Sequence, residues 1–182
     1  MRMLQYFAPD IICRSITDIP LDELKERGIR GLLFDLDNTI TEWQKDEVTE
    51  RNKQWLHDLR EQGFSICIVS NNHAPRVKRV AEQLGLPCLH SAAKPRRKSY
   101  WQAAALLKLA PQQLAMVGDQ LLTDVLGGNR AGLTTIFVEY IHPREHWGTT
   151  HIFRPVESWL LKRLENKGFS EKSGGKKWQG NG

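Results

Sequence analysis

Short apolar segments alternate along the chain with stretches that have helical spacing. We expect strands near residues 30–36, 64–70, 86–90, 113–118 and 133–139. We expect helices between them, at 50–62, 75–84, 98–109 and 121–130. Strands that alternate with helices in this way join as parallel neighbours through right-handed crossovers. The pattern therefore predicts an α/β fold, a Rossmann-like three-layer sandwich with a parallel five-stranded sheet.

Two acidic residues follow the first of these strands. Residues 32–34 are an unbroken apolar run, typical of a strand that is covered on both faces, and Asp35 and Asp37 lie at its carboxyl end. Ligands of open α/β sheets bind at this end of the strands. Two carboxylates this close repel each other unless a cation or a shared proton lies between them. The segment therefore predicts a functional site.

Polar residues also follow the later strands. Ser70 and Asn71 come after the second, Lys94 after the third, and Asp119 and Asp124 after the fourth. Each has a simpler interpretation when taken alone. An Asp or Ser at the end of a strand often forms a turn or caps a helix, and a lysine within a basic run is usually solvated.

Taken together and in this order, these residues resemble the four motifs of the haloacid dehalogenase (HAD) superfamily: DxDxT, then Ser or Thr, then Lys, then GDxxxxD. The resemblance implies an aspartyl-phosphate mechanism. Asp35 is then the nucleophile, and Asp37 protonates the leaving group and later deprotonates water.

The same resemblance implies a cofactor and a phosphate-binding set. Mg²⁺ would be held by Asp35, the backbone carbonyl of Asp37, Asp119 and Asp124, because this ion prefers oxygen ligands. The phosphoryl group would be bound by three residues: Ser70, Asn71 and Lys94. An acid at position 37 favours phosphate esters over organic halides, since a halide leaves without a proton.

The spacing of the motifs leaves no room for a cap domain. Only about thirty residues separate Asp37 from Ser70, and even a small independent domain needs about 50. We therefore expect an uncapped HAD enzyme, of a kind that acts on large substrates or uses a partner as a lid.

Further matches resemble the HAD subfamily IIIA phosphatases of the phosphatidylglycerophosphate phosphatase type. They include Phe7-Ala8-Pro9, the Asp-Leu-Asp-Asn-Thr core from Asp35, and Gly118 to Val125. This resemblance implies phosphatidylglycerophosphate, and so phospholipid biosynthesis, as the substrate and role. Two alternatives stay open. One is a phosphatase of another large or soluble monoester, such as a nucleic-acid end, a nucleotide or a sugar phosphate. The other is a catalytically idle HAD-shaped binding module.

Composition is consistent with one domain. Of the 182 residues, we assign 1–165 to the HAD-like domain, with 1–27 as a lead-in segment, and 166–182 to a disordered basic tail. No apolar run approaches the roughly 18 residues that span a bilayer, and no signal-peptide pattern is present, so we expect a cytoplasmic protein. The cysteines have no CxxC spacing, which favours reduced buried thiols over disulfides or zinc.

Basic residues flank the second and third motifs. They are Arg76, Lys78, Arg79, Arg96, Arg97 and Lys98. We expect them to form a cationic rim that suits an anionic membrane surface, although solvated helix faces would give the same pattern. Without interleaved aromatic residues, nucleic acid is not favoured as a partner. Oligomerisation stays open.

Overall fold

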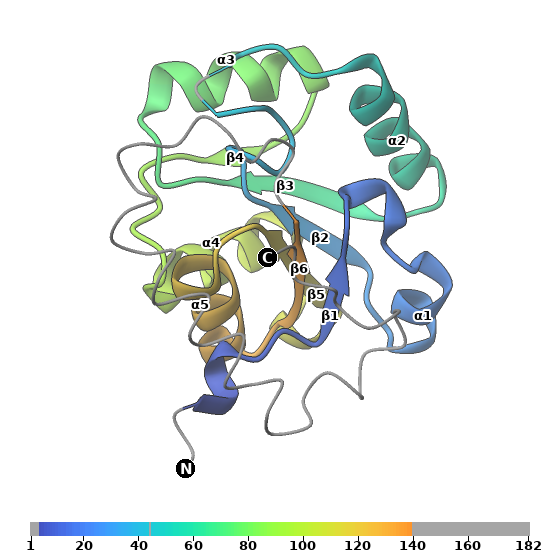
Figure 1. Ribbon diagram of the computed structural model, residues 1–182, viewed down its shortest axis with the longest axis vertical. Coiled ribbons are helices and arrows are strands. Elements are labelled where there is room, and N and C mark those ends of the chain that lie inside the picture. The colour runs from blue at the N-terminus through green and yellow to red at the C-terminus, as the bar shows by residue number, and fades with distance from the viewer. Residues whose placement is uncertain (1–3, 44, 140–182) are drawn as a thin grey trace, which may run out of the picture.

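The computed structural model describes residues 4–43 and 45–139, so the expected tail at 166–182 lies outside the described residues. The chain folds around a six-stranded sheet in the order β1-β6-β5-β2-β3-β4, in which every neighbouring pair is parallel (Figure 1). The strands are β1 (Ile11–Cys13), β2 (Gly31–Phe34), β3 (Ser65–Val69), β4 (Cys88–Leu89), β5 (Leu114–Gly118) and β6 (Thr134–Val138). The predicted α/β architecture is confirmed.

The prediction of five strands is wrong by one, because the lead-in segment supplies β1. This strand pairs with β6, with Ile11 opposite Ile136. The carboxylate of Asp10 accepts a hydrogen bond from the backbone N–H of Thr135 at 2.8 Å, which holds the start of β1 against β6. A strand of three residues is too short to show an alternating pattern in the sequence.

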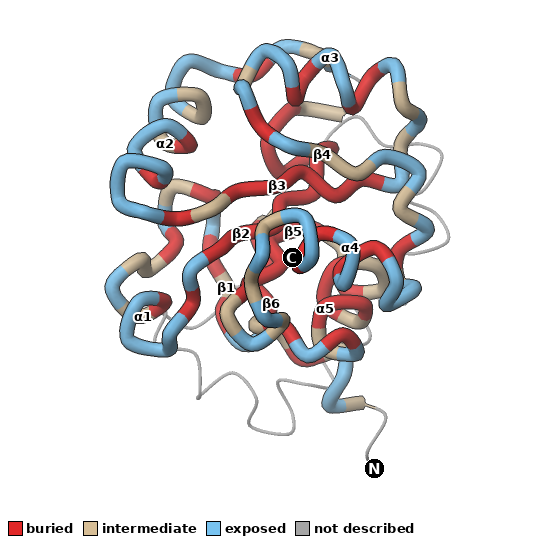
Figure 2. The backbone as a smooth tube through the Cα atoms, turned by 180° about the vertical axis from the view of Figure 1, so that it is seen from behind, coloured by how far each residue is buried: buried red, intermediate tan, exposed pale blue. Residues whose placement is uncertain are grey.

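Helices cover both faces of the sheet and complete three layers (Figure 1). One face packs against α1 (Leu21–Glu26), α2 (Glu50–Glu61) and α3 (Ala74–Leu84), and the other against α4 (Arg97–Leu107) and α5 (Leu126–Ala131). Short turns complete the described elements: η1 (Leu4–Phe7), η2 (Ile16–Asp18), η3 (Pro111–Gln113) and η4 (Leu121–Val125). Figure 2 shows the central strands buried along their length, as the continuous apolar runs predict.

Local signals in the sequence set the ends of the helices. The hydroxyl of Thr49 caps α2 by accepting a hydrogen bond from the N–H of Asn52 at 3.2 Å. Pro75 lies in the first turn of α3, where its missing N–H costs nothing. Gly85 ends α3 with a φ of 61°, a conformation that favours glycine.

The order of the strands decides where a site can form. From β2 the chain moves outward through α2 to β3 and β4, and from β5 it moves the other way through α5 to β6. The carboxyl ends of β2 and β5 therefore flank the point where the connections reverse, which is where open α/β sheets bind ligands. Between Asp37 and Ser70 lie only the β2–α2 loop (residues 38–49), α2 and β3 among the described residues. The described part of this segment holds no separate domain.

The cysteines are free thiols, with Cys13 and Cys67 buried. Burial raises the pKa of each of these two thiols to about 12, so both are protonated at neutral pH. Across residues 4–43 and 45–139, no helix combines the length and apolar character needed to cross a membrane.

Candidate active site

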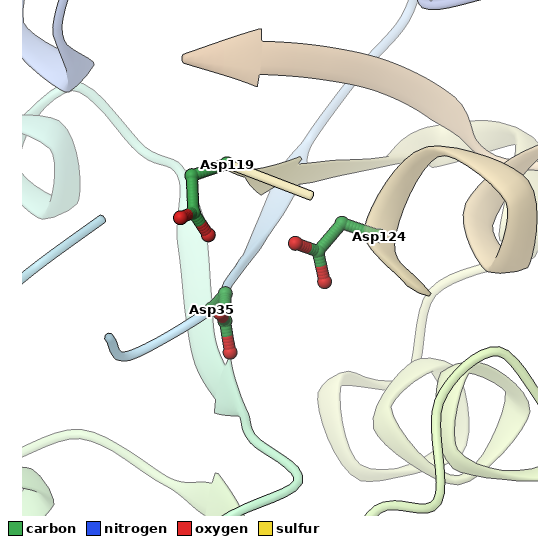
Figure 3. Close-up of side chains that lie close together, drawn as sticks. All are labelled: Asp35, Asp119 and Asp124. Atoms are coloured by element: carbon green, nitrogen blue, oxygen red, sulfur yellow. The ribbon is translucent and has the colours of Figure 1, made fainter. Parts of the chain in front are cut away.

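Three carboxylates meet where the connections of the sheet reverse. Asp35 directly follows β2, Asp119 directly follows β5, and Asp124 lies in η4. One oxygen of each lies within 4.8 Å of the others, and all three residues are buried (Figure 3). Parallel strands that end at one edge thus bring together acids that are 84 to 89 residues apart in sequence (119 − 35 and 124 − 35).

A π-helical turn directs Asp124 back toward the end of β5. The helix expected over 121–130 is present, but its first part, η4, is π-helical, and α5 begins only at Leu126. The carboxylate of Asp124 accepts a hydrogen bond from the N–H of Gln120 at 3.2 Å. A Cβ atom at Gly118 would lie 2.2 Å from Asp124 Oδ2, so a side chain at position 118 would displace this acid. Such π turns frequently occur at functional sites.

Lys94 is the cation of this cluster. Its ammonium donates to Asp35 Oδ1 and to Asp124 Oδ1, each at 2.7 Å, and its side chain is 2% exposed. The simpler interpretation of a solvated lysine is therefore wrong. The side-chain amide of Asn71 donates to the carbonyl of Lys94 at 3.2 Å and accepts from its N–H at 2.7 Å. Asn71 thus fixes the loop that carries the lysine.

The electrostatics of this cluster are unbalanced. Burial raises the pKa of Asp35 and of Asp119, and neighbouring carboxylates raise it further. Burial opposes the charge of Lys94, but Asp124 and Asp35 outweigh that effect and raise the pKa of the ammonium. Three carboxylates thus face one ammonium, which leaves a sum of two negative charges when all are ionised.

An unpaired oxygen points to what balances this charge. Among the described residues, Asp119 Oδ1 is a buried atom without a hydrogen-bond partner. Buried polar atoms are nearly always satisfied, so an orphaned carboxylate oxygen beside other acids is the kind of donor that a hard cation takes. The residues present therefore fit a divalent cation with oxygen ligands.

Asp37, two residues after Asp35, belongs to a second cluster of charged side chains. Arg76 Nη1 lies 2.7 Å from Asp37 Oδ1 and donates to Oδ2 at 2.9 Å. The amide of Asn72 donates to the same Oδ2 at 3.1 Å. Arg76 also pairs with Asp46, at 3.1 Å. Asp46 also pairs with Arg79, at 2.9 Å. We call these four residues the loop cluster: Asp37, Asp46, Arg76 and Arg79.

The structure corrects the expected cationic rim at one position and adds site residues. Arg76 is 7% exposed and ion-paired, so it is not part of an exposed rim. Sequence reasoning also gave no role to Asn38, whose amide donates to Asp119 Oδ2 at 3.3 Å, or to Asn72. Two signals in the sequence could have indicated these residues: Asn38 lies inside the DxDxT segment, and Asn72 directly follows Ser70-Asn71. Ser70 is buried, and its hydroxyl accepts from the N–H of Asn72 at 3.1 Å.

Comparisons with known proteins agree with this geometry. A family model described as mitochondrial PGP phosphatase matches residues 1–141. The chain is 40% identical over 164 residues to a probable phosphatase, YqeG, of Bacillus subtilis, covering 90% of this chain and 95% of the relative. It is 30% identical to phosphatidylglycerophosphate phosphatase 1 of Chlamydomonas reinhardtii, covering 85% of this chain. It is 25% identical to phosphatidylglycerophosphate phosphatase 1 of Arabidopsis thaliana, an alignment that covers 90% of this chain. The chain spans 61% and 50% of these two longer relatives.

A solved structure shares the fold. The cobalt-bound deoxy-D-mannose-octulosonate 8-phosphate phosphatase of Haemophilus influenzae superposes with a TM-score of 0.52 at 16% identity, covering 78% of this chain and 92% of that one.

Fold, motifs and relatives together define the class of this protein, which is a HAD-type phosphatase. Since the family model spans well over half of the chain, the chain belongs to the PGP (phosphatidylglycerophosphate) phosphatase family.

Proposed function

We propose that this protein is a Mg²⁺-dependent phosphate monoester hydrolase that works through an aspartyl-phosphate at Asp35, with phosphatidylglycerophosphate as its substrate. The observation that carries the metal-dependent part is the cluster of three buried carboxylates, one with an orphaned oxygen, opposed by a single ammonium. The substrate assignment is supported by the family match and by relatives named for that activity.

Asp35 and Asp37 divide the chemistry. A carboxylate oxygen of Asp35 attacks phosphorus while the ester oxygen leaves, and Asp37, which enters this step as the carboxylic acid, gives its proton to the alkoxide and becomes a carboxylate. Asp37 then accepts a proton from the water that cleaves the aspartyl-phosphate. The position of Asp37 two residues after the nucleophile allows both carboxylates to face the same phosphoryl group.

The other site residues hold the charge in place. Lys94, fixed by two carboxylates and by Asn71, offers positive charge to the phosphoryl oxygens and keeps Asp35 oriented. The Ser70 hydroxyl is suited to donate to a phosphoryl oxygen. Asp35, the carbonyl of Asp37, Asp119 and Asp124 would hold Mg²⁺, which supplies charge neutralisation for the approaching phosphate.

The experiment that tests the substrate is a Mg²⁺-supplemented hydrolysis screen of the full chain. The panel contains phosphatidylglycerophosphate in vesicles, a nucleotide, a sugar phosphate and an oligonucleotide 3′-phosphate. We expect the highest kcat/KM on the lipid. A preference of orders of magnitude for a soluble phosphate would overturn the lipid assignment and leave the phosphatase class intact. An absence of hydrolysis of every member would favour the idle binding module.

A lipid substrate requires contact with a membrane surface, and one exposed basic patch beside the site suits this contact. We call Arg96, Arg97 and Lys98, all exposed at the start of α4 two to four residues after Lys94, the rim patch. Arg97 stacks over the ring of Trp101 at 5.1 Å, and Trp101 is 45% exposed. Aromatic and basic side chains together favour the interface of an anionic bilayer.

Charge reversal of the rim patch tests this contact. The triple variant Arg96→Glu, Arg97→Glu, Lys98→Glu should bind anionic vesicles about 100-fold more weakly, since each basic residue contributes about 1 kcal/mol near such a surface. A matched triple reversal at Arg30, Lys108 and Arg130, which are exposed near the opposite ends of the strands, should change binding far less. Vesicle sedimentation at two salt concentrations measures both. Equal loss in the two variants would contradict a patch-specific contact.

A further inference from the structure

The guanidinium of Arg76, on α3, contacts two separate points of the segment that follows β2, Asp37 and residues 45–46. It donates through Nη1 to Asp37, through Nε to Asp46 Oδ1 at 3.1 Å, and through Nη2 to the carbonyl of Lys45 at 2.7 Å. All three of its nitrogens are thus engaged. One partner is the carboxylate assigned to proton transfer, and the other two belong to the β2–α2 loop.

Other contacts also join this loop to α3. Gln83 donates to the carbonyl of Asp46 at 3.3 Å, and the exposed Arg79 pairs with Asp46 Oδ2. Both of these contacts are on the solvent side, whereas the side chain of Arg76 is 9% exposed. A buried arginine that donates to three acceptors fixes their positions relative to one another, because its fork is planar.

We propose that Arg76 is a positioning residue for Asp37, and that it ties the orientation of this carboxylate to the position of the β2–α2 loop. The β2–α2 loop lies between Asp37 and Ser70, where a cap domain would have to be inserted. A substrate that displaces the loop then also displaces Asp37. The inference rests on the acid role proposed for Asp37, and the test below separates the two.

The test compares substrates that differ in their need for an acid. An alkyl ester such as glycerol phosphate needs protonation of its leaving group, whereas para-nitrophenyl phosphate leaves without much protonation. Arg76→Lys keeps the charge but removes the fork. It should lower kcat on the alkyl ester about tenfold more than kcat on the aryl ester, because a misplaced acid loses part of the 10²- to 10⁴-fold contribution of general acid catalysis. Arg76→Met should widen this difference.

Arg79→Met is the matched control, because it removes a cation from the same Asp46 without touching Asp37. It should leave the alkyl-to-aryl ratio unchanged. Thermal melting of each variant checks folding. If Arg76→Lys does not melt cooperatively, Asp46→Asn carries the same test, since it breaks the loop side of the connection; its ratio should then change while that of Arg79→Met does not.

Asp37→Asn is the reference that separates the two ideas. If Asp37→Asn lowers both substrates equally, the acid role is wrong and the positioning role falls with it. If Asp37→Asn is selective for the alkyl ester and Arg76→Lys is not, the acid role stands and the positioning role of Arg76 is overturned. An altered ratio in Arg79→Met would likewise contradict a role specific to Arg76.

Discussion

Two charged clusters lie at the same edge of the sheet, yet their balance differs. The cluster of Asp35, Asp119, Asp124 and Lys94 holds three acids against one base. The loop cluster holds two acids against two bases, each acid in contact with an arginine. Buried charge is costly unless it is paired. The first cluster therefore requires an additional cation or protons, whereas the second is complete with its own residues.

The difference suggests how to recognise which clusters of charged side chains require a bound cation. The unbalanced cluster includes a carboxylate oxygen without a partner among the described residues, Asp119 Oδ1. In the balanced cluster, the three donor nitrogens of Arg76 all have acceptors. The sum of charges and the unsatisfied oxygen thus distinguish a cluster that requires a cation from one whose charged side chains pair with each other.

The largest effect should come from the nucleophile of the unbalanced cluster. Asp35→Asn keeps the volume of the side chain but removes its charge, so turnover should fall by about a thousandfold or more. Steady-state hydrolysis of para-nitrophenyl phosphate measures the loss, and circular dichroism checks that the fold is intact. Hydrolysis near the wild-type rate would contradict the aspartyl-phosphate mechanism.

A smaller effect should separate the two remaining acids of that cluster. Asp119→Ala removes the orphaned oxygen and should raise the Mg²⁺ concentration for half-maximal activity by about tenfold or more, as loss of a metal-site contact does elsewhere. In Asp124 both oxygens already accept hydrogen bonds, from Lys94 and from Gln120. Asp124→Ala should therefore lower kcat more than it changes the Mg²⁺ requirement.

Mg²⁺ titrations of activity after treatment with a chelator measure this difference. Activity that persists in excess chelator would contradict the metal site. An equal rise in Mg²⁺ requirement for Asp119→Ala and Asp124→Ala would show that the orphaned oxygen has no special role.

The smallest effect concerns thermal stability: removing the charge of one acid should raise Tm in the first cluster and lower Tm in the loop cluster. In chelator at neutral pH, Asp119→Asn removes one of three mutually repelling acids and should raise Tm by about 2–4 °C, the shift that about 1 kcal/mol produces in a chain of this size. Asp46→Asn removes an acid that is paired with two arginines and should lower Tm by a similar amount. Thermal melts of both variants measure the shifts, and shifts of the same sign would contradict the difference in charge balance.

The sequence predicted the architecture well where its signals were local. The apolar runs of β2 and β5 are long and continuous, and turn residues such as Gly85 mark the helix ends. The edge strand β1 was missed because three residues carry no periodicity. The π turn at η4 was missed because its residues have ordinary helical composition. Its distinguishing feature, the close packing of the Asp124 side chain against Gly118, is a contact that a local pattern does not show.

The site was harder to predict where a partner lies far away in sequence. Motif order alone indicated the acids that the structure brings together, since each follows a strand of one parallel sheet. The burial of Arg76 could not be predicted in the same way, because its acceptors Asp37 and Asp46 are 39 and 30 residues distant. A basic residue near a motif has the same local appearance whether it is solvated or engaged by such acceptors.

The pairing of β1 with β6 has a consequence for the order in which this domain can be completed during synthesis. The contact between Asp10 and Thr135 spans 125 residues, and β6 is the last described strand to be made. At about 5–20 residues per second, the ribosome takes roughly 6–25 s to make this intervening chain. During that interval β6, the strand that pairs with β1 among the described residues, is not yet complete. The sheet therefore closes at this edge only after translation has passed β6, and until then the nascent chain presents an unpaired strand to chaperones and to neighbouring chains.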